Sequence, residues 1–206
     1  MQTVVITDND LSYAVEVIKS GGLVGVPTET VYGLAGNGLD TAAVERIYEV
    51  KGRPSVKPLS LLVPGLDVAA TVCAEIPESA RLLAEAFWPG PLTIVLPKSD
   101  TVPSIVTAGG DTVGVRCPDH PLTLEFLRLS EIPVAAPSAN ISDMPSPKSA
   151  EEVLEYFNGK IDCIIDGGRC ELGVESTIVS LVENPYIIIR QGALSEEHIR
   201  SVLGLD

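Results

Sequence analysis

The sequence predicts an α/β fold built on a mixed β-sheet. Short apolar segments of strand length alternate along the chain with segments whose apolar residues recur at helical spacing, a pattern typical of α/β proteins. The last two predicted strands, Thr177–Val182 and Tyr186–Arg190, are separated only by Glu183-Asn184-Pro185 and therefore form an antiparallel hairpin. A hairpin within an alternating α/β pattern indicates a sheet with both parallel and antiparallel strands.

In the N-terminal half, the elements follow from apolar spacing and from the residues that interrupt it. Apolar residues at i, i+3, i+4 and i+7 predict a helix, and a short apolar run ended by Pro or Gly predicts a strand. The predicted elements are the strand Val4–Ile6, a helix that follows Asp8 and Asp10 and ends at Gly21-Gly22, the strand Leu23–Val26, a helix capped by Asp40 in which Val44, Ile47 and Tyr48 face inward, the strand Leu59–Val63 and the helix Pro77–Phe87.

The C-terminal half repeats the alternation with shorter strands. Serine residues stand where an N-cap is needed, and the strands are rich in Val and Ile. The predicted elements are the strands Leu92–Leu96 and Val113–Arg116, the helix Leu122–Leu129, the strand Ile132–Ala136, a helix opened by Ser149, the strand Ile161–Ile165, the two hairpin strands named above and a final helix capped by Ser195.

Length and composition indicate one globular domain, predicted to span residues 1–206. Hydrophobic residues make up 45% of the chain and charged residues 20%, which excludes a disordered protein. The sequence contains no apolar stretch of the ~18 residues that a membrane span needs, and no basic segment followed by an apolar one at its start. We therefore expect a cytoplasmic protein that does not enter a membrane.

The charge balance restricts the kind of ligand. The formal net charge of −14 opposes general nucleic-acid binding, since that affinity comes largely from Lys and Arg, so any anion site must be local. The cysteines form no CxxC pair and show no metal-ligand spacing to a histidine, so no protein-held metal is predicted. The four residues expected to be reduced thiols are Cys73, Cys117, Cys163 and Cys170.

Several common catalytic motifs are missing from the sequence. It has no GxxxxGK[ST] loop, no GxGxxG fingerprint and no GxSxG elbow, and its two histidines leave little scope for a Ser–His–acid triad. An enzyme with this sequence is expected to hold charged substrates in place without a covalent nucleophile.

Polar segments stand beside the predicted strands. Residues 27–34 (PTETVYGL) offer two threonines and a carboxylate to an amino or hydroxyl group, or form a capped turn between a strand and a helix. Residues 51–60 (KGRPSVKPLS) carry three basic residues in a loop stiffened by proline. This loop favours a triphosphate site, although basic residues also stabilise a helix C-terminus.

Two further segments suit a carboxylate and a nucleotide. Arg116 ends a strand and matches a carboxylate, while Ser138 and Asn140 of PSAN offer a hydroxyl and an amide to phosphate or ribose, or simply form a turn. Ser176 and Arg190 lie at neighbouring strand ends of the hairpin, where ligands of α/β sheets commonly bind. The simpler interpretation of Arg190 is a strand-end residue that reaches water.

Six motifs occur in order between residues 20 and 192: PTETVYGL, KGRP followed by PLS, VRCP, APSANISDMPSP, ESTIV and IIRQG. In this combination the chain resembles the YrdC-type threonylcarbamoyl-AMP synthase family, also called Sua5/YciO/YrdC. The resemblance implies a twisted mixed β-sheet with flanking helices around a concave, positively charged cavity. It also implies an L-threonylcarbamoyladenylate synthase, a nucleotidyltransferase that converts L-threonine, bicarbonate and ATP, with Mg²⁺, into threonylcarbamoyl-AMP and pyrophosphate. Partner proteins then transfer the threonylcarbamoyl group to A37 of tRNAs that read ANN codons, and tRNA itself binds weakly at most.

The resemblance also implies which residues bind each substrate. Those implied for threonine are Thr28, Tyr32, Ser60, Arg116 and Ser176. Those implied for ATP are Lys51, Arg53, Ser138, Asn140, Ser146 and Arg190. Catalysis then consists of positioning and charge stabilisation, chiefly by Lys51 and Arg53, and no residue acts as a nucleophile.

The sequence departs from the family pattern in two places. Some members carry a His shortly after KxRP, where this chain has Pro58-Leu59-Ser60, so Ser60 is expected to take its place. Longer members carry a linker and a C-terminal domain, and this chain resembles the short, single-domain form. The alternatives are an RNA-binding module, a carbamoyl-transfer domain of the hydrogenase-maturation type and an inactive paralogue. The acidic composition and the low aromatic content of 4% oppose an RNA-binding module. The lack of acylphosphatase and zinc-finger segments opposes the carbamoyl-transfer domain, and the intact PTETVYGL opposes an inactive paralogue.

Overall fold

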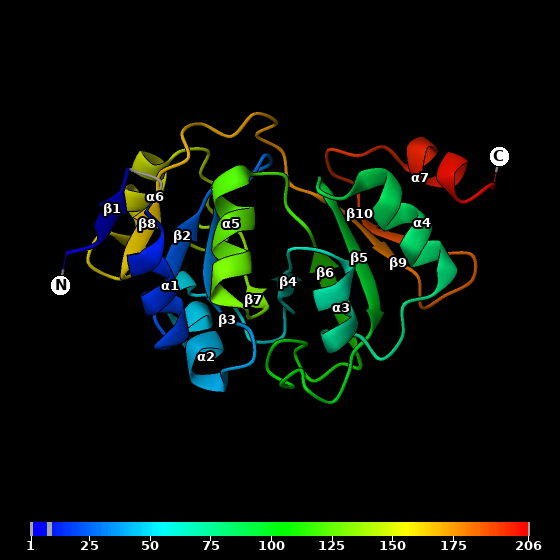
Figure 1. The fold of residues 1–206 in the computed structure, drawn as a ribbon, viewed down its shortest axis with the longest axis horizontal. Coiled ribbons are helices and arrows are strands. Elements are labelled where there is room, and N and C mark those ends of the chain that lie inside the picture. Colours follow the sequence, from blue (N-terminus) through cyan, green and yellow to red (C-terminus); the bar gives the residue numbers. More distant parts are fainter. Residues whose placement is uncertain (1, 8–9, 206) are drawn as a thin grey trace.

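A ten-stranded sheet runs through the computed structural model, which describes residues 2–7 and 10–205 (Figure 1). The strands are β1 (Val4–Ile6), β2 (Val24–Val26), β3 (Gly33–Asn37), β4 (Ser60–Leu62), β5 (Leu92–Pro97), β6 (Thr112–Arg116), β7 (Val134–Ala135), β8 (Cys163–Ile165), β9 (Thr177–Ser180) and β10 (Ile187–Arg190). Across the sheet their order is β1-β8-β2-β3-β7-β4-β6-β5-β9-β10. Many neighbours in the sheet are therefore distant in sequence.

The sheet is mixed, as the sequence predicted. The pairs β1–β8, β8–β2, β4–β6 and β5–β9 are parallel. The pairs β2–β3, β3–β7, β4–β7 and β5–β6 are antiparallel, and β9–β10 is the predicted hairpin. Every strand predicted from the sequence is present with small shifts at its ends, the largest at β7, which keeps only Val134–Ala135 of the predicted 132–136.

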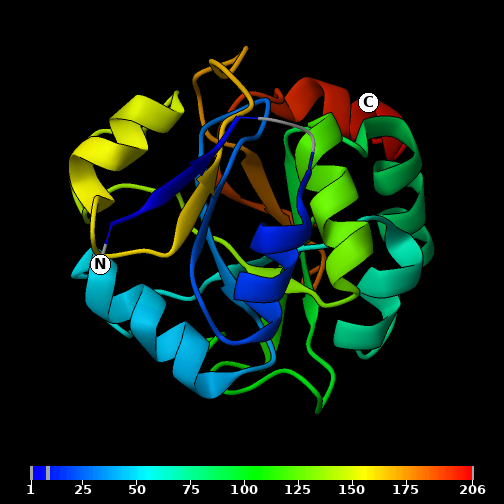
Figure 2. The same ribbon diagram turned by 60° about the vertical axis from the view of Figure 1, so that its left-hand side comes forward.

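Helices lie on both sides of the sheet (Figure 2). They are α1 (Ser12–Lys19), α2 (Thr41–Lys51), α3 (Leu66–Val72), α4 (Glu78–Phe87), α5 (Pro121–Ser130), α6 (Ala150–Phe157) and α7 (Glu196–Val202). The predicted caps are confirmed, because the side chains of Asp40, Ser149 and Ser195 accept hydrogen bonds from backbone nitrogens of the following turn. The predicted first helix is present and begins at Ser12. Asp8, one of the two aspartates expected to precede it, lies outside the described residues.

Two groups of buried apolar side chains cover the two faces of the sheet. Successive residues of β3 belong to different groups, Leu34 to the larger and Ala35 to the smaller, as the alternation of side chains along a strand requires. The larger group includes Val44 and Ile47 of α2, and the smaller includes Phe126 of α5. Because both faces are covered, the strands read as continuous apolar runs in the sequence.

Strand β3 was not predicted. Its sequence, Gly-Leu-Ala-Gly-Asn, has low strand propensity, yet it pairs with β2 on one side and β7 on the other. A Cβ atom on Gly36 would lie 2.9 Å from Cδ1 of Ile47, so the glycine allows α2 to pack closely against the strand. Tertiary packing therefore overrides local propensity here, and PTETVYGL connects two antiparallel strands, so its interpretation as a turn between a strand and a helix is wrong.

The short helix α3 was also not predicted. It follows Pro64-Gly65, which were interpreted only as the end of a strand, and its seven residues are too few for a clear helical period. Ala69 and Val72 of this helix are buried in the larger apolar group. Burial of these two side chains stabilises a helix that its own sequence specifies weakly.

We predict that Gly36→Ala lowers the free energy of unfolding by about 1–3 kcal/mol, because the added methyl group overpacks the contact with Ile47. Combining it with Ile47→Ala should cost less than the sum of the two single changes, since the second change makes room for the first. Urea unfolding of the wild type, both single variants and the double variant measures this coupling. Strictly additive losses would contradict the proposed close contact between α2 and β3.

Candidate functional site

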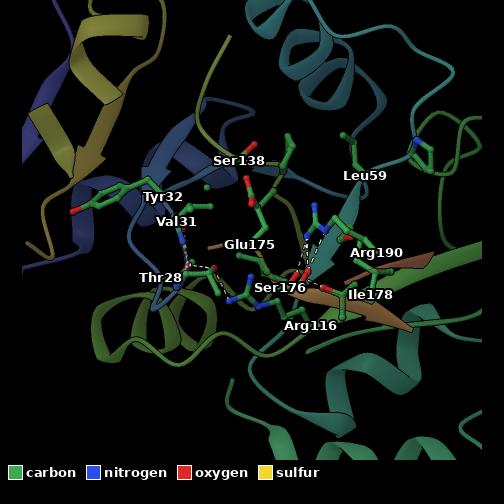
Figure 3. A pocket seen from close by; sticks show the side chains of 18 of the residues that line it. Thr28, Val31, Tyr32, Leu59, Arg116, Ser138, Glu175, Ser176, Ile178 and Arg190 are labelled. Atoms are coloured by element: carbon green, nitrogen blue, oxygen red, sulfur yellow. Dashed lines mark hydrogen bonds between the residues drawn. The ribbon is translucent and has the colours of Figure 1, made fainter. Parts of the chain in front are cut away.

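One pocket brings together most of the residues singled out in the sequence (Figure 3). It lies between the loop after β2, the loop before β4, the loop after β7 and the adjacent ends of β6, β9 and β10. It encloses about 750 Å³, counting the space at its mouth. The predicted residues that line it are Thr28, Tyr32, Arg53, Ser60, Arg116, Ser138, Ser176 and Arg190. Lys51, Asn140 and Ser146 are not among its lining residues.

Thr28 closes the loop that follows β2. Its Oγ1 donates a hydrogen bond to the backbone oxygen of Val31 at 2.6 Å and accepts hydrogen bonds from the backbone nitrogens of Thr30 and Val31 at 3.1 and 3.2 Å. It also lies 2.8 Å from Oγ1 of Thr30. The hydroxyl thus satisfies backbone groups that have no strand partner where the chain reverses direction between β2 and β3.

Arg116, the last residue of β6, lies buried beside this loop. Its Nη2 donates to Oε1 of Glu29 at 2.6 Å and to Oγ1 of Thr30 at 2.9 Å, and its Nε donates to the backbone oxygen of Gly90 at 3.2 Å. Oε2 of Glu29 accepts a hydrogen bond from the backbone nitrogen of Asp119 at 3.1 Å. Arg116 and Glu29 are each 7% exposed. Glu29 is therefore paired within the protein, which leaves the pocket-facing part of the Arg116 guanidinium for a ligand.

Lys51 ends α2, as predicted, but its amine is directed into the protein. The residue is 1% exposed, and its Nζ donates to the backbone oxygens of Ser138 and Asn140, both at 2.5 Å. Burial, and secondarily the charge of Arg53, lowers the pKa of this amine to about 7. In this arrangement Lys51 fixes the loop that carries Ser138, and its contact with ATP phosphates stays a prediction.

The loop after β7 is held together by its own side chains. Ser138 Oγ donates to Oδ1 of Asn140 at 2.5 Å, and Nδ2 of Asn140 donates to the backbone oxygens of Ile141 and Met144 at 2.9 and 2.7 Å. Asn140 is buried, so its amide stabilises the loop, whereas Ser138 lines the pocket. The interpretation of PSAN as a turn is therefore correct for Asn140. Ser138 lines the pocket, and its contact with phosphate or ribose stays a prediction.

Two arginines complete the cationic part of the lining, Arg53 half-buried and Arg190 exposed. Arg53 donates from Nε to the backbone oxygen of Lys57 at 3.2 Å and from Nη2 to that of Pro58 at 3.0 Å, which closes its own proline-containing loop. Arg190 donates from Nε and Nη2 to the backbone oxygen of Ser176 at 3.1 and 2.8 Å. Both guanidinium groups are thus held in place before any ligand arrives, which lowers the entropic cost of binding an anion.

Tyr32 and Ser60 contribute to the pocket in different ways. The hydroxyl of Tyr32 donates to the backbone oxygen of Gly168 at 2.8 Å and accepts from the nitrogen of Gly167 at 3.1 Å, and Figure 3 shows it pointing away from Glu175 and Arg190. Burial raises the pKa of this phenol, so it stays protonated. Ser60 lines the pocket at the start of β4, where a Cβ on its neighbour Gly114 would come within 2.9 Å of Oγ. Whether Ser60 replaces the family histidine stays a prediction.

Among the lining residues that were not predicted as site residues, three have polar or charged side chains: Thr30, Thr93 and Glu175. Thr30 and Glu175 stand inside motifs that were recognised, PTETVYGL and ESTIV, so their position was a usable signal. Thr93 is buried in β5, where its Oγ1 lies 2.9 Å from Oγ of Ser176. Nothing in the local sequence of an apolar strand distinguishes such a residue, because the contact depends on the pairing of β5 with β9.

The charged side chains that line the pocket are Arg53, Arg116, Arg190 and Glu175. Cations therefore outnumber anions there, although the whole chain carries a net charge of −14. Of these three guanidinium groups, that of Arg116 is already paired with the buried carboxylate of Glu29. The part of the chain that the structure describes contains no group of three His, Cys, Asp or Glu residues that could hold a metal ion, and all four cysteines are free thiols, as predicted.

The comparisons with known proteins agree with this arrangement of motifs. The family model for Sua5/YciO/YrdC proteins, which bears the description "Telomere recombination", matches residues 16–192. The chain belongs to the Sua5/YciO/YrdC family. The family resemblance drawn from the six motifs is therefore confirmed.

Relatives of known name cover nearly the whole chain. A threonylcarbamoyl-AMP synthase from Pyrococcus abyssi is 54% identical over 187 residues, 91% of this chain and 55% of that protein. A threonylcarbamoyl-AMP synthase from Bacillus subtilis is 43% identical over 198 residues, 96% of this chain and 57% of that protein. The chain thus spans little more than half the length of these relatives.

Solved structures confirm the fold class. The structure of P. abyssi Sua5 complexed with L-threonine has a TM-score of 0.94 and 50% identity, and the match covers 98% of this chain and 60% of that one. The described residues form no helix that is long and apolar enough to cross a membrane.

We predict that Lys51→Met destabilises the protein by about 2–4 kcal/mol at neutral pH, because two buried carbonyl oxygens lose their donor. The lowered pKa of Lys51 means that, between about pH 7 and its ordinary value, the unfolded chain binds more protons at this amine than the folded protein does. Its contribution to stability therefore rises with pH across this range, and the loss caused by the substitution should grow. Chemical unfolding at pH 7 and pH 9 measures both effects, and an unchanged unfolding midpoint would contradict the structural role.

We also predict that Arg116 and Glu29 depend on each other for stability. Glu29→Gln or Arg116→Met alone leaves one buried charge unpaired and should cost about 3–5 kcal/mol. The double variant should lose less than the sum, since neither charge remains. Thermal unfolding of the wild type, the two single variants and the double variant measures this coupling. Glu125→Gln serves as a control, since Glu125 forms an exposed pair with Arg128, and its free energy of unfolding should stay within about 0.5 kcal/mol of the wild type.

Proposed function

We propose that this chain is an L-threonylcarbamoyladenylate synthase, a nucleotidyltransferase that uses L-threonine, bicarbonate and ATP. The observation that carries the proposal is the single pocket in which residues implied for threonine and residues implied for ATP lie together. Relatives that are 54% and 43% identical bear the name of this activity, and the related P. abyssi protein is solved with L-threonine. The overall reaction yields threonylcarbamoyl-AMP, pyrophosphate and water.

In this proposal the amino acid lies near Arg116. A carboxylate matches the free side of its guanidinium, and the hydroxyls of Thr28 and Ser176 border the same space. Tyr32 is also among the lining residues, but its side chain is fully buried and its hydroxyl is bonded to the loop at Gly167 and Gly168. Ser60 also lines the pocket.

ATP is proposed to occupy the part of the pocket lined by Arg53, Ser138 and Arg190. The two guanidinium groups neutralise phosphate charge, and Ser138 offers a hydroxyl. Lys51 and Asn140 then act mainly by holding the loop at Ser138, and Ser146 by holding Glu175. The family resemblance implied that six residues contact ATP directly, whereas only three of them line the pocket here. Lys51, Asn140 and Ser146 could contact ATP only if their loops rearranged when it binds.

The chemistry needs no nucleophile from the protein. The α-ammonium group of threonine first loses a proton to solvent. The neutral amine then attacks the carbon of bicarbonate, forming an N–C bond and releasing water, and an oxygen of the resulting carbamate attacks the α-phosphorus of ATP, releasing pyrophosphate. The protein contributes proximity and charge neutralisation, which together can supply a large part of a rate enhancement. A pocket walled by fixed guanidinium groups suits both needs.

Mg²⁺ is proposed to arrive with ATP. The carboxylate among the lining residues is that of Glu175, so the described residues offer no cage of carboxylates for the ion. When bound to the triphosphate, Mg²⁺ would add charge neutralisation to that of Arg53 and Arg190.

Threonylcarbamoyl-transferring proteins are the proposed downstream partners. They would pass the group to A37 of tRNAs that read ANN codons, with tRNA contacting this acidic chain weakly at most. Because these substrates belong to translation, the cytoplasm is the proposed location.

We predict that pyrophosphate release from ATP requires threonine and bicarbonate together. Each added singly should give less than about a tenth of the joint rate, because the nucleophile toward phosphorus is the carbamate that the two form. A coupled pyrophosphate assay in degassed, bicarbonate-free buffer measures this. Equal release with threonine alone would indicate formation of an ordinary aminoacyl-adenylate and contradict the proposal.

Two arginine variants show whether that activity belongs to this pocket. Arg53→Ala removes a half-buried lining cation and should raise the KM for ATP roughly tenfold or more, since a charge-assisted contact is lost. Arg128→Ala removes an exposed arginine of α5 that lies outside the pocket and should leave both KM values unchanged.

A further inference from the structure

Three of the four charged side chains that line the pocket are arginines, and the fourth is Glu175. The arginines suit the anionic groups of the proposed substrates, namely phosphates and carboxylates. Threonine at neutral pH also carries an α-ammonium group, which the arginines repel. A pocket that binds this zwitterion therefore needs a negative or strongly accepting group as well.

Glu175 is held so that its carboxylate faces the pocket. Its backbone oxygen accepts a hydrogen bond from the nitrogen of Ala193 at 2.9 Å, and its Oε1 accepts one from Oγ of Ser146 at 2.6 Å. Gly192 packs against it so closely that a Cβ there would lie 2.3 Å from this backbone oxygen. Figure 3 shows the side chain reaching from the segment before β9 into the space between Ser138 and Arg190.

The nearby carboxylate of Glu29 does not serve this purpose. Both of its oxygens are occupied, one by Arg116 at 2.6 Å and the other by the backbone nitrogen of Asp119 at 3.1 Å, and Glu29 is not among the pocket-lining residues. At Glu175, by contrast, Ser146 is the only side chain of the described residues that donates to the carboxylate, and it uses one oxygen. Capacity for a charged donor therefore remains at Glu175.

We propose that Glu175 binds the α-ammonium group of the amino-acid substrate and makes the pocket selective for α-amino acids over 2-hydroxy acids. The proposal deepens the proposed function and rests on it. In this arrangement the amino acid extends from Arg116 toward Glu175, so its amino group lies beside the part of the pocket proposed for ATP. Ser146 is a positioning residue that acts through Glu175.

The electrostatic surroundings keep this carboxylate ionised. The hydrogen bond from Ser146, with smaller contributions from the charges of Arg190 and Lys148, lowers the pKa of Glu175 below its ordinary value. At neutral pH a negative charge thus faces the pocket. Such a charge forms an ion pair with an ammonium group, whereas a 2-hydroxy acid donates only one hydrogen bond to it, from an uncharged hydroxyl.

The test compares two ligands that differ at one group. Calorimetric titrations would measure the dissociation constants of L-threonine and of 2,3-dihydroxybutanoate, in which a hydroxyl replaces the amino group, for the wild type and for Glu175→Gln. The wild type should prefer threonine, and Glu175→Gln should reduce this preference at least about tenfold, because an ion pair is replaced by a hydrogen bond from the ammonium group to an uncharged amide. Affinity for the hydroxy acid should change less than about twofold.

Two further variants make the result specific. Ser146→Ala keeps the charge of Glu175 but frees its side chain, so it should reduce the preference for threonine by a smaller factor than Glu175→Gln does. Glu171→Gln removes an exposed glutamate of the same loop that is not among the residues lining this pocket, and the preference should stay that of the wild type.

Each contrary outcome has its own meaning. Unchanged threonine affinity in a folded Glu175→Gln variant would overturn the assignment. A raised KM for Mg²⁺–ATP with unchanged threonine affinity would also overturn it and assign Glu175 to the nucleotide. Failure of the wild-type protein to bind threonine at all would count against the proposed function itself, and the ligand comparison separates that result from a failure at Glu175 alone.

Discussion

The buried ion pair between Arg116 and Glu29 connects two segments of the pocket wall that are distant in sequence. At 2.6 Å, with each residue 7% exposed, it ties the end of β6 to the loop between β2 and β3. The same guanidinium reaches Thr30 and Gly90, and Glu29 reaches the backbone at Asp119. Because an unpaired charge at this depth is strongly unfavourable, the pair fixes how these segments meet and which side of Arg116 faces the pocket.

The other walls of the pocket are stabilised in the same manner, by polar side chains that satisfy backbone groups. Lys51 bonds to carbonyl oxygens of the loop after β7, Asn140 closes that loop, and Arg190 bonds to the backbone at Ser176. Loops rich in proline and glycine cannot supply these hydrogen bonds from regular ladders. A preorganised pocket results, in which positive charges stay close together despite the acidity of the chain.

This arrangement separates residues that touch the ligand space from residues that hold them. Ser138 lines the pocket while Asn140, two residues later, is buried in its own loop, and Ser146 reaches the pocket only through Glu175. The spacing within a motif does not distinguish these roles, since both kinds of residue are polar and lie between prolines. The distinction depends on which side chain the loop turns outward, and the neighbouring segments decide that.

The sequence by itself determined the α/β class, the mixed sheet, the caps at Asp40, Ser149 and Ser195, and the six motifs, because apolar periodicity, capping residues and motif order are local properties of the chain. Tertiary structure decided that Gly33–Asn37 is a central strand, that Lys51 and Glu29 face inward and that Thr93 meets Ser176. Each of these depends on a contact between segments distant in sequence. The free energy of burying a charge, or of packing a glycine against a helix, depends on the partner that the distant segment supplies. No local sequence pattern specifies that partner.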